Sequence, residues 1–241
     1  GGLRNMASTV IKNWDNKTWL SSKNYINSFN NFLIKNTKIN SNFKILDIGC
    51  GRGRILGSLS SRLNLKEKPL GIDVVNHKDK DKRINFKKTN VLNLSLKKNQ
   101  KFDLILIKQT IHLMKLSEIK RLLRSLKKKL SSKGKIFIFT LDTEKNEIPT
   151  FKLMKLKLNK SLKRDRKILN IIKDVYPHII KKKFIFDVRI TKKKYLDMIR
   201  NRYISTLIPF SKKELTKGTQ EINSKYKDIL RFKDKLICII L

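Results

Sequence analysis

The chain is poor in cysteine and has no long apolar runs. Its two cysteines, Cys50 and Cys238, lie far apart in 241 residues, so they build neither a disulfide framework nor a zinc-binding pattern. No apolar run approaches the roughly 20 residues that a membrane span requires, and no signal peptide is recognisable. A folded protein in the reducing cytoplasm, without a bound metal, is therefore expected.

Acidic residues are also scarce, with 19 Asp and Glu against 58 Lys and Arg, which gives a net charge of +39. Such a charge attracts phosphates, so a nucleic acid or an anionic membrane surface is one interpretation of it. The other is compositional, because Lys, Asn and Ile are all over-used, as in a genome rich in A and T. The lysines are spread along the chain, and no aromatic-plus-basic RNA motif accompanies them. We favour composition, and a polyanion site stays open.

Strand and helix patterns alternate from residue 43 onward, which predicts an α/β protein with a largely parallel sheet. Strands are expected at 44–48, 70–75, 85–87, 102–107, 135–141, 184–190 and 235–241. Helices are expected at 54–63, 192–203, 212–227 and 117–130, the last capped by Ser117 and stopped by Gly134. Residues 8–39 predict a helical preface with a Ser21-Ser22 cap, and residues 143–183 an insertion of one or two helices.

The stretch Lys44–Gly57, KILDIGCGRGRILG, organises the prediction. A short buried strand enters a turn with glycine at 49, 51 and 53 and leaves as a helix, which is how a nucleotide-type cofactor is held. The dinucleotide fingerprint would need a glycine where Arg54 stands. With Asp47 at the strand end, the pattern instead resembles the first motif of the class I S-adenosylmethionine (SAM)-dependent methyltransferases.

Further segments resemble this family in the expected order. They are the acid Asp73 at the end of the second strand, the run FDLILI leading to His112, and SSKGKIFIF at the approach to the fifth strand. The likeness is strongest to the type 11 group and, at the RNRYIST end, to the trans-aconitate-methyltransferase-like branch. It implies a three-layer Rossmann-like fold with a seven-stranded, mostly parallel sheet, an antiparallel last strand and a helical cap. The single domain would comprise a lid (1–42), a cofactor-binding core (43–142), the insertion (143–183) and C-terminal strands and substrate-side helices (184–241).

The resemblance implies that SAM is the cofactor and S-adenosylhomocysteine (SAH) the product. Asp73 would accept the ribose hydroxyls, Asp47 would hold the methionyl amino group, and Asn90 would face the adenine amine. Lys108 is expected to contribute backbone, because a cation beside the sulfonium would repel it. The whole expected set is Asp47, Gly49, Cys50, Gly51, Gly53, Asp73, Val74, Asn90, Val91, Lys108 and Gln109.

His112 matches a histidine of the type 11 pattern and is a candidate general base, with a structural hydrogen-bonding role as the alternative. Candidate substrate residues, each of which has a plain core or surface interpretation, are Trp19, Tyr25, Arg202, Tyr203 and Ser205. In-line methyl transfer to a small molecule is the expected reaction, since it needs little beyond alignment. The Asn-Pro-Pro-Tyr motif of amino-methylating DNA and protein enzymes is absent after residue 107. An RNA or other nucleic-acid methyltransferase and a non-catalytic SAM-binding protein remain alternatives, and the oligomeric state is not indicated.

Overall fold

The structure, a computed structural model, describes residues 18–108 and 110–241. The strands are β1 (Ile45–Ile48), β2 (Leu70–Asp73), β3 (Asn85–Lys88), β4 (Phe102–Lys108), β5 (Leu130–Leu141), β6 (Ile180–Thr191) and β7 (Ile229–Ile240). The α-helices are α2 (Lys23–Asn36), α3 (Arg54–Leu63), α4 (Leu116–Lys127), α5 (Lys152–Val175), α6 (Lys192–Arg200) and α7 (Lys212–Lys225). Short 3-10 helices are η2 (Trp19–Ser21), η3 (Val91–Asn93), η4 (Ile111–Leu113) and η5 (Ser205–Leu207).

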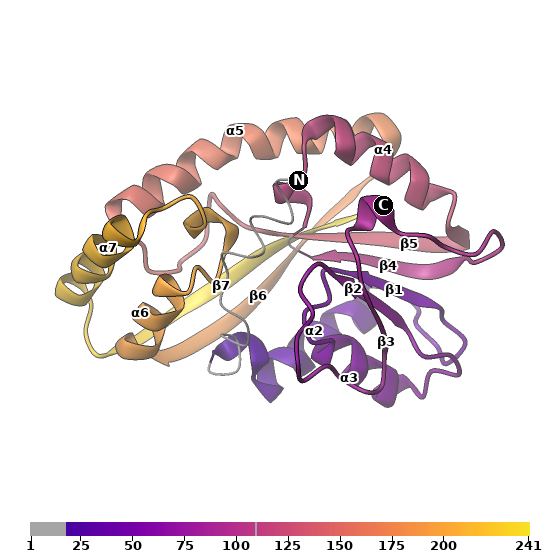
Figure 1. Cartoon of the computed structure of the whole chain (residues 1–241), viewed down its shortest axis with the longest axis horizontal. Coiled ribbons are helices and arrows are strands. Elements are labelled where there is room, and N and C mark those ends of the chain that lie inside the picture. Colours follow the sequence, from indigo (N-terminus) through magenta and orange to yellow (C-terminus); the bar gives the residue numbers. More distant parts are fainter. Residues whose placement is uncertain (1–17, 109) are drawn as a thin grey trace.

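One seven-stranded sheet runs through the molecule in the order β3-β2-β1-β4-β5-β7-β6 (Figure 1). The first five strands in this order are parallel, whereas β7 is antiparallel to both β5 and β6. The predicted fold, with its mostly parallel sheet and antiparallel last strand, is therefore confirmed.

Helices cover both faces of this sheet, because its central strands are apolar on both sides. Leu46 and Ile48 of β1 pack in a core with α4 and α5, whereas Ile45 packs with α2 and α3 on the other face. Figure 1 shows α4 and α5 above the sheet and α2 and α3 below it. The result is the three-layer arrangement expected from the sequence.

The antiparallel pair of β6 and β7 extends past the other strands. Only residues 236–240 of β7 pair with β5, whereas β6 pairs with β7 along residues 229–240. Helices α6 and α7 lie beside this extension (Figure 1). The predicted insertion before β6 contains the single long helix α5, which runs from beside α7 to beside α4 (Figure 1). No described helix is long and apolar enough to cross a bilayer.

Several predicted element boundaries are wrong. The strands β5, β6 and β7 begin at Leu130, Ile180 and Ile229, four to six residues before the predicted 135, 184 and 235, because strand pairing extends them. The helix predicted to reach residue 130 ends at Lys127.

Helix α4 begins at Leu116 and not at a Ser117 cap, because Glu118 accepts the Lys115 N–H at 3.1 Å and fixes the helix one residue earlier. Gly134 does not stop this helix: it lies inside β5, at an irregularity where a Cβ would meet the Phe102 carbonyl at 2.7 Å. Helix α6 ends at Arg200 and not at 203, since Arg202 adopts a positive φ of 52°.

Candidate cofactor-binding site

The glycine turn joins β1 to α3 at the carboxyl end of the sheet. Gly49, Gly51 and Gly53 all have positive φ, between 57° and 83°. The N–H groups of Gly49 and Cys50 donate to the Ile72 carbonyl at 2.9 and 3.0 Å, so the turn is tied to β2. In an open α/β sheet this edge, beside the first strand, is where a ligand is expected.

Asp73 anchors the turn through its carboxylate. Its Oδ2 accepts the Gly51 N–H at 2.8 Å, and its Oδ1 accepts the Val75 N–H at 3.0 Å. A carboxylate has about four lone-pair sites, so two of them remain for other donors. Asp73 is half-buried at the end of β2, as predicted, with Val74 half-buried beside it. This structural duty was not foreseen from the sequence.

Asp47 is fully buried and pairs with a lysine. Its register partner on β4 is Leu106, which brings Lys108 of the same strand next to it, and Lys108 Nζ lies 2.9 Å from Asp47 Oδ2. Burial raises the pKa of the Asp47 carboxyl, and the Lys108 ammonium opposes that shift. The side chain of Lys108 is thus engaged through its charge, whereas the sequence predicted that only its backbone would matter. The reason is the desolvated acid beside it, which needs a cation.

The remaining predicted cofactor residues lie around the same edge. Asn90 caps η3 by accepting the Leu92 N–H at 3.0 Å, and Val91 is buried. Cys50 is buried in the turn, where burial raises the pKa of its thiol. Gln109 lies outside the described residues. Whether these residues contact the cofactor stays a prediction.

His112 meets an acid that the sequence analysis missed. Its Nδ1 lies 3.7 Å from Asp165 Oδ1, and Asp165 Oδ2 accepts the Thr143 hydroxyl at 2.6 Å. Asp165 belongs to α5, so the insertion supplies it. Burial lowers the pKa of His112, with the Asp165 carboxylate opposing the shift. The lowered pKa favours the neutral imidazole. The only sequence signal for Asp165 was its being an acid in a Lys-rich helix.

Three predicted substrate residues lie in aromatic clusters of the core. Trp19, Tyr25 and Tyr203 are 4–7% exposed. Trp19 packs on Tyr195 and Tyr203, with ring centroids 6.3 and 5.7 Å away, and its indole N–H donates to the buried Asp234 at 3.0 Å.

Tyr25 packs instead on aromatic rings of β6, with the Phe186 centroid 5.0 Å away. Of the other two candidates, Arg202 donates to the Phe210 carbonyl at 2.9 Å and Ser205 begins η5, both half-buried. The structure thus assigns packing or backbone contacts to four of the five candidates, and their contact with a substrate stays a prediction.

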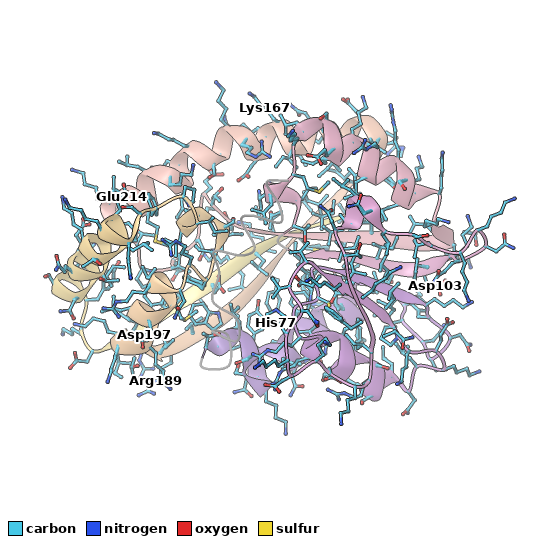
Figure 2. All side chains as sticks on the ribbon, viewed as in Figure 1. His77, Asp103, Lys167, Arg189, Asp197 and Glu214 are labelled. Atoms are coloured by element: carbon cyan, nitrogen blue, oxygen red, sulfur yellow. The ribbon has the colours of Figure 1, made fainter. Side chains whose placement is uncertain are left out.

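Charges of both signs meet at the site. Asp47 and Asp73 lie near Lys108, and the buried Arg52 stands in the glycine turn itself. Burial, more than the nearby Asp73, raises the pKa of Asp47. Elsewhere charged side chains project from all around the molecule, with the exposed Lys167 on α5 and Arg189 on β6 at opposite edges (Figure 2). No group of three or more His, Cys, Asp or Glu suited to a metal occurs in 18–108 and 110–241.

Several solved structures share this fold. The plantazolicin methyltransferase BpumL in complex with SAH is 21% identical, with a TM-score of 0.54, 98% of this chain and 88% of that chain being covered. Precorrin-6y C5,15-methyltransferase from Geobacter metallireducens is 10% identical, with a TM-score of 0.51 and coverages of 91% and 88%. A comparison with curated protein sequences gave no match.

A family model described as "Methyltransferase domain" matches residues 39–203, which is more than half of the chain and includes β1 to α6. The matched segment holds the glycine turn, Asp47, Asp73, Lys108 and His112. The more specific likeness to the type 11 and trans-aconitate-methyltransferase-like groups stays a prediction. The chain belongs to the methyltransferase-domain family, and its fold is that of the class I SAM-dependent methyltransferases.

Proposed function

We propose that this protein transfers a methyl group from SAM to a small-molecule acceptor by in-line displacement. The observation that carries the proposal is the turn at the end of β1, where two carboxylates, Asp47 and Asp73, flank three glycines of positive φ. SAM supplies an activated methyl group on a sulfonium. With one further ammonium and one carboxylate it carries charges of both signs, which the carboxylates of Asp47 and Asp73 and the ammonium of Lys108 can face.

The residues present fit the cofactor on two counts. A Cβ built on Gly51 would meet no atom of the described residues within 4 Å, so the backbone is open to a ligand there. Asp47 Oδ1 is buried and accepts no hydrogen bond from the described part of the chain, which leaves an acceptor for an ammonium. Asp73 would hold the ribose hydroxyls with its two remaining lone-pair sites.

His112 is the proposed general base for the acceptor. Its Nδ1 faces Asp165, which favours the tautomer with a proton on that nitrogen and leaves Nε2 to take a proton. The Thr143 hydroxyl holds the other oxygen of Asp165 and so fixes the carboxylate. The base is therefore neutral and oriented before any substrate arrives.

The acceptor class rests on the neighbouring structures and on the region around α6 and α7. BpumL has been crystallised with a pentazolic desmethylPZN analog and SAH, at 21% identity and a TM-score of 0.53. In this chain the β6–β7 extension, α6, α7 and η2 add a second lobe beside the cofactor core (Figure 1). We assign substrate selection to this lobe and to the preface (1–42), within a single domain whose core is 43–142 and whose insertion is 143–183.

Calorimetric titration of SAM into the purified protein, with NAD as the control ligand, tests the cofactor. Binding of SAM but not NAD is expected. Absence of SAM binding in a folded protein would overturn the proposal. Turnover with any acceptor would exclude a non-catalytic SAM-binding protein.

RNA methylation is the second candidate, and the net charge of +39 favours it. Three basic residues of α4 (Lys120, Arg121 and Arg124) and its C-cap Lys128 line one hollow with Ser117 and Ser125. If RNA is the acceptor, log affinity falls linearly with log salt as counterions are released, and RNA alters the SAM titration. A SAM titration that RNA leaves unchanged would exclude RNA as the acceptor.

A further inference from the structure

Asp47 and Lys108 form a closely buried ion pair where β1 and β4 end side by side. The carboxylate is fully buried, the lysine side chain is 14% exposed, and Nζ lies 2.9 Å from Oδ2. The same ammonium lies 5.9 Å from the centroid of the Phe29 ring on α2. Moving two ions out of water is costly, and their attraction recovers the cost only when their other polar atoms are also bonded.

This pair is incomplete on both sides. Asp47 Oδ1 is buried and has no donor among residues 18–108 and 110–241. The Lys108 ammonium has three N–H donors, and its ion pair with Asp47 engages at most one of them. One open acceptor therefore lies beside open donors of opposite charge. A ligand that carries an ammonium and a carboxylate on the same carbon complements both.

We propose that Lys108 binds the α-carboxylate of the methionyl part of SAM while Asp47 binds its α-ammonium, so that the pair recognises the amino-acid zwitterion. This inference rests on the proposed function, because it specifies how the same cofactor is selected. It makes Lys108 a specificity-determining residue. The expected repulsion from the sulfonium is offset, because the Lys108 charge is neutralised on one side by Asp47 and on the other by the ligand carboxylate.

The opposite arrangement makes a different prediction. If Lys108 merely occupied the place of the ligand ammonium, it would compete with SAM, and its removal would tighten binding. That arrangement would leave the buried Asp47 Oδ1 without any hydrogen-bond donor, even when SAM is bound. The sign of the affinity change on removing the ammonium separates the two arrangements.

The experiment compares three ligands by calorimetry: SAM, decarboxylated SAM, which lacks the carboxylate, and 5′-methylthioadenosine, which lacks the whole zwitterion. Lys108→Met is expected to weaken SAM by about tenfold to a hundredfold, the range of a charge-assisted hydrogen bond. Its affinity for the neutral 5′-methylthioadenosine should stay within about twofold of the wild type, and its affinity for decarboxylated SAM, which has no carboxylate to lose, should not fall. Lys44→Met is the matched control, since it removes an exposed lysine just before β1, at the opposite end of the strand.

A second variant covers the case in which Lys108→Met leaves Asp47 unpaired and does not fold. The double variant Asp47→Asn/Lys108→Met has no buried charge at this place, and it should bind SAM no more tightly than 5′-methylthioadenosine. Either variant keeping the wild-type preference for SAM over decarboxylated SAM, or tighter SAM binding by Lys108→Met, would overturn the inference alone. A folded wild-type protein that binds none of the three ligands would overturn the proposed function as well.

Discussion

Two glycines of the same turn are expected to respond differently to the same substitution. Gly49 and Gly51 have φ angles of 83° and 57°. A Cβ on Gly49 would lie 2.5 Å from the Lys108 carbonyl oxygen and 2.7 Å from Thr110 Oγ1, whereas a Cβ on Gly51 would meet no described atom within 4 Å. Alanine therefore collides with the end of β4 at one position and enters open space at the other. Gly49 is required by packing, and Gly51 is predicted to face the ligand.

The magnitudes follow from these contacts. A left-handed conformation costs a non-glycine residue about 1–2 kcal/mol. Alanine has less conformational freedom than glycine in the unfolded chain, which offsets part of that cost. Gly51→Ala should therefore lose about 1 kcal/mol of stability. Overpacking against a rigid neighbour adds about 1–3 kcal/mol, which brings Gly49→Ala to about 3 kcal/mol. Urea unfolding at an unchanged m value measures both losses. SAM titration of the folded variants should show at least tenfold weaker binding by Gly51→Ala.

Two results would refute this reasoning. Folded Gly51→Ala that binds SAM as tightly as the wild type would show that the space beside Gly51 does not receive the cofactor. Equal stability losses for the two variants would show that the end of β4 moves aside at little cost, so that Gly49 is not required by packing.

Four further predictions concern single side chains. Asp73→Ala should weaken SAM at least tenfold in calorimetry, and unchanged affinity would remove the ribose assignment. His112→Ala should lower kcat without changing SAM affinity, whereas full turnover would leave His112 a structural role. Burial lowers the pKa of His112, and the Asp165 carboxylate opposes that shift. Asp165→Asn should therefore lower the pKa of His112 further and move the acid limb of the kcat profile to lower pH. An unmoved limb would show that Asp165 does not act on the catalytic group. Burial raises the pKa of Asp234, so the stability linked to this carboxyl is present at low pH and lost as pH rises through its native pKa. Asp234→Asn should abolish that dependence in urea unfolding across pH, and an unchanged profile would contradict it.

Local patterns in the sequence were sufficient to predict the sheet and the glycine turn. The helix 54–63 agrees with α3 at both ends, because glycine, a capping turn and an apolar spacing coincide there. Gly134 shows the limit of such reasoning. A glycine after a helix normally ends it, but here the glycine is needed for close approach to the Phe102 carbonyl on the neighbouring strand. That contact depends on strand pairing, which a local pattern does not contain.

The candidate site divides in the same way. Asp47 and Asp73 could be predicted because each occupies a fixed place at the end of a strand. Asp165 could not, because it lies 53 residues after His112, on an insertion whose path over the sheet only the folded chain defines.

Lys108 is the most instructive case, since its position was predicted and its behaviour was not. Considered alone, a lysine beside a sulfonium is unfavourable. Parallel pairing of β1 with β4 places it 2.9 Å from a fully buried carboxylate, which removes most of that objection and supplies a reason for the charge. Asp47 without Lys108 would be a buried, unpaired acid, and Lys108 without Asp47 would be a cation repelling the cofactor. Each residue makes the other tolerable, so the two are to be understood, and mutated, as one unit.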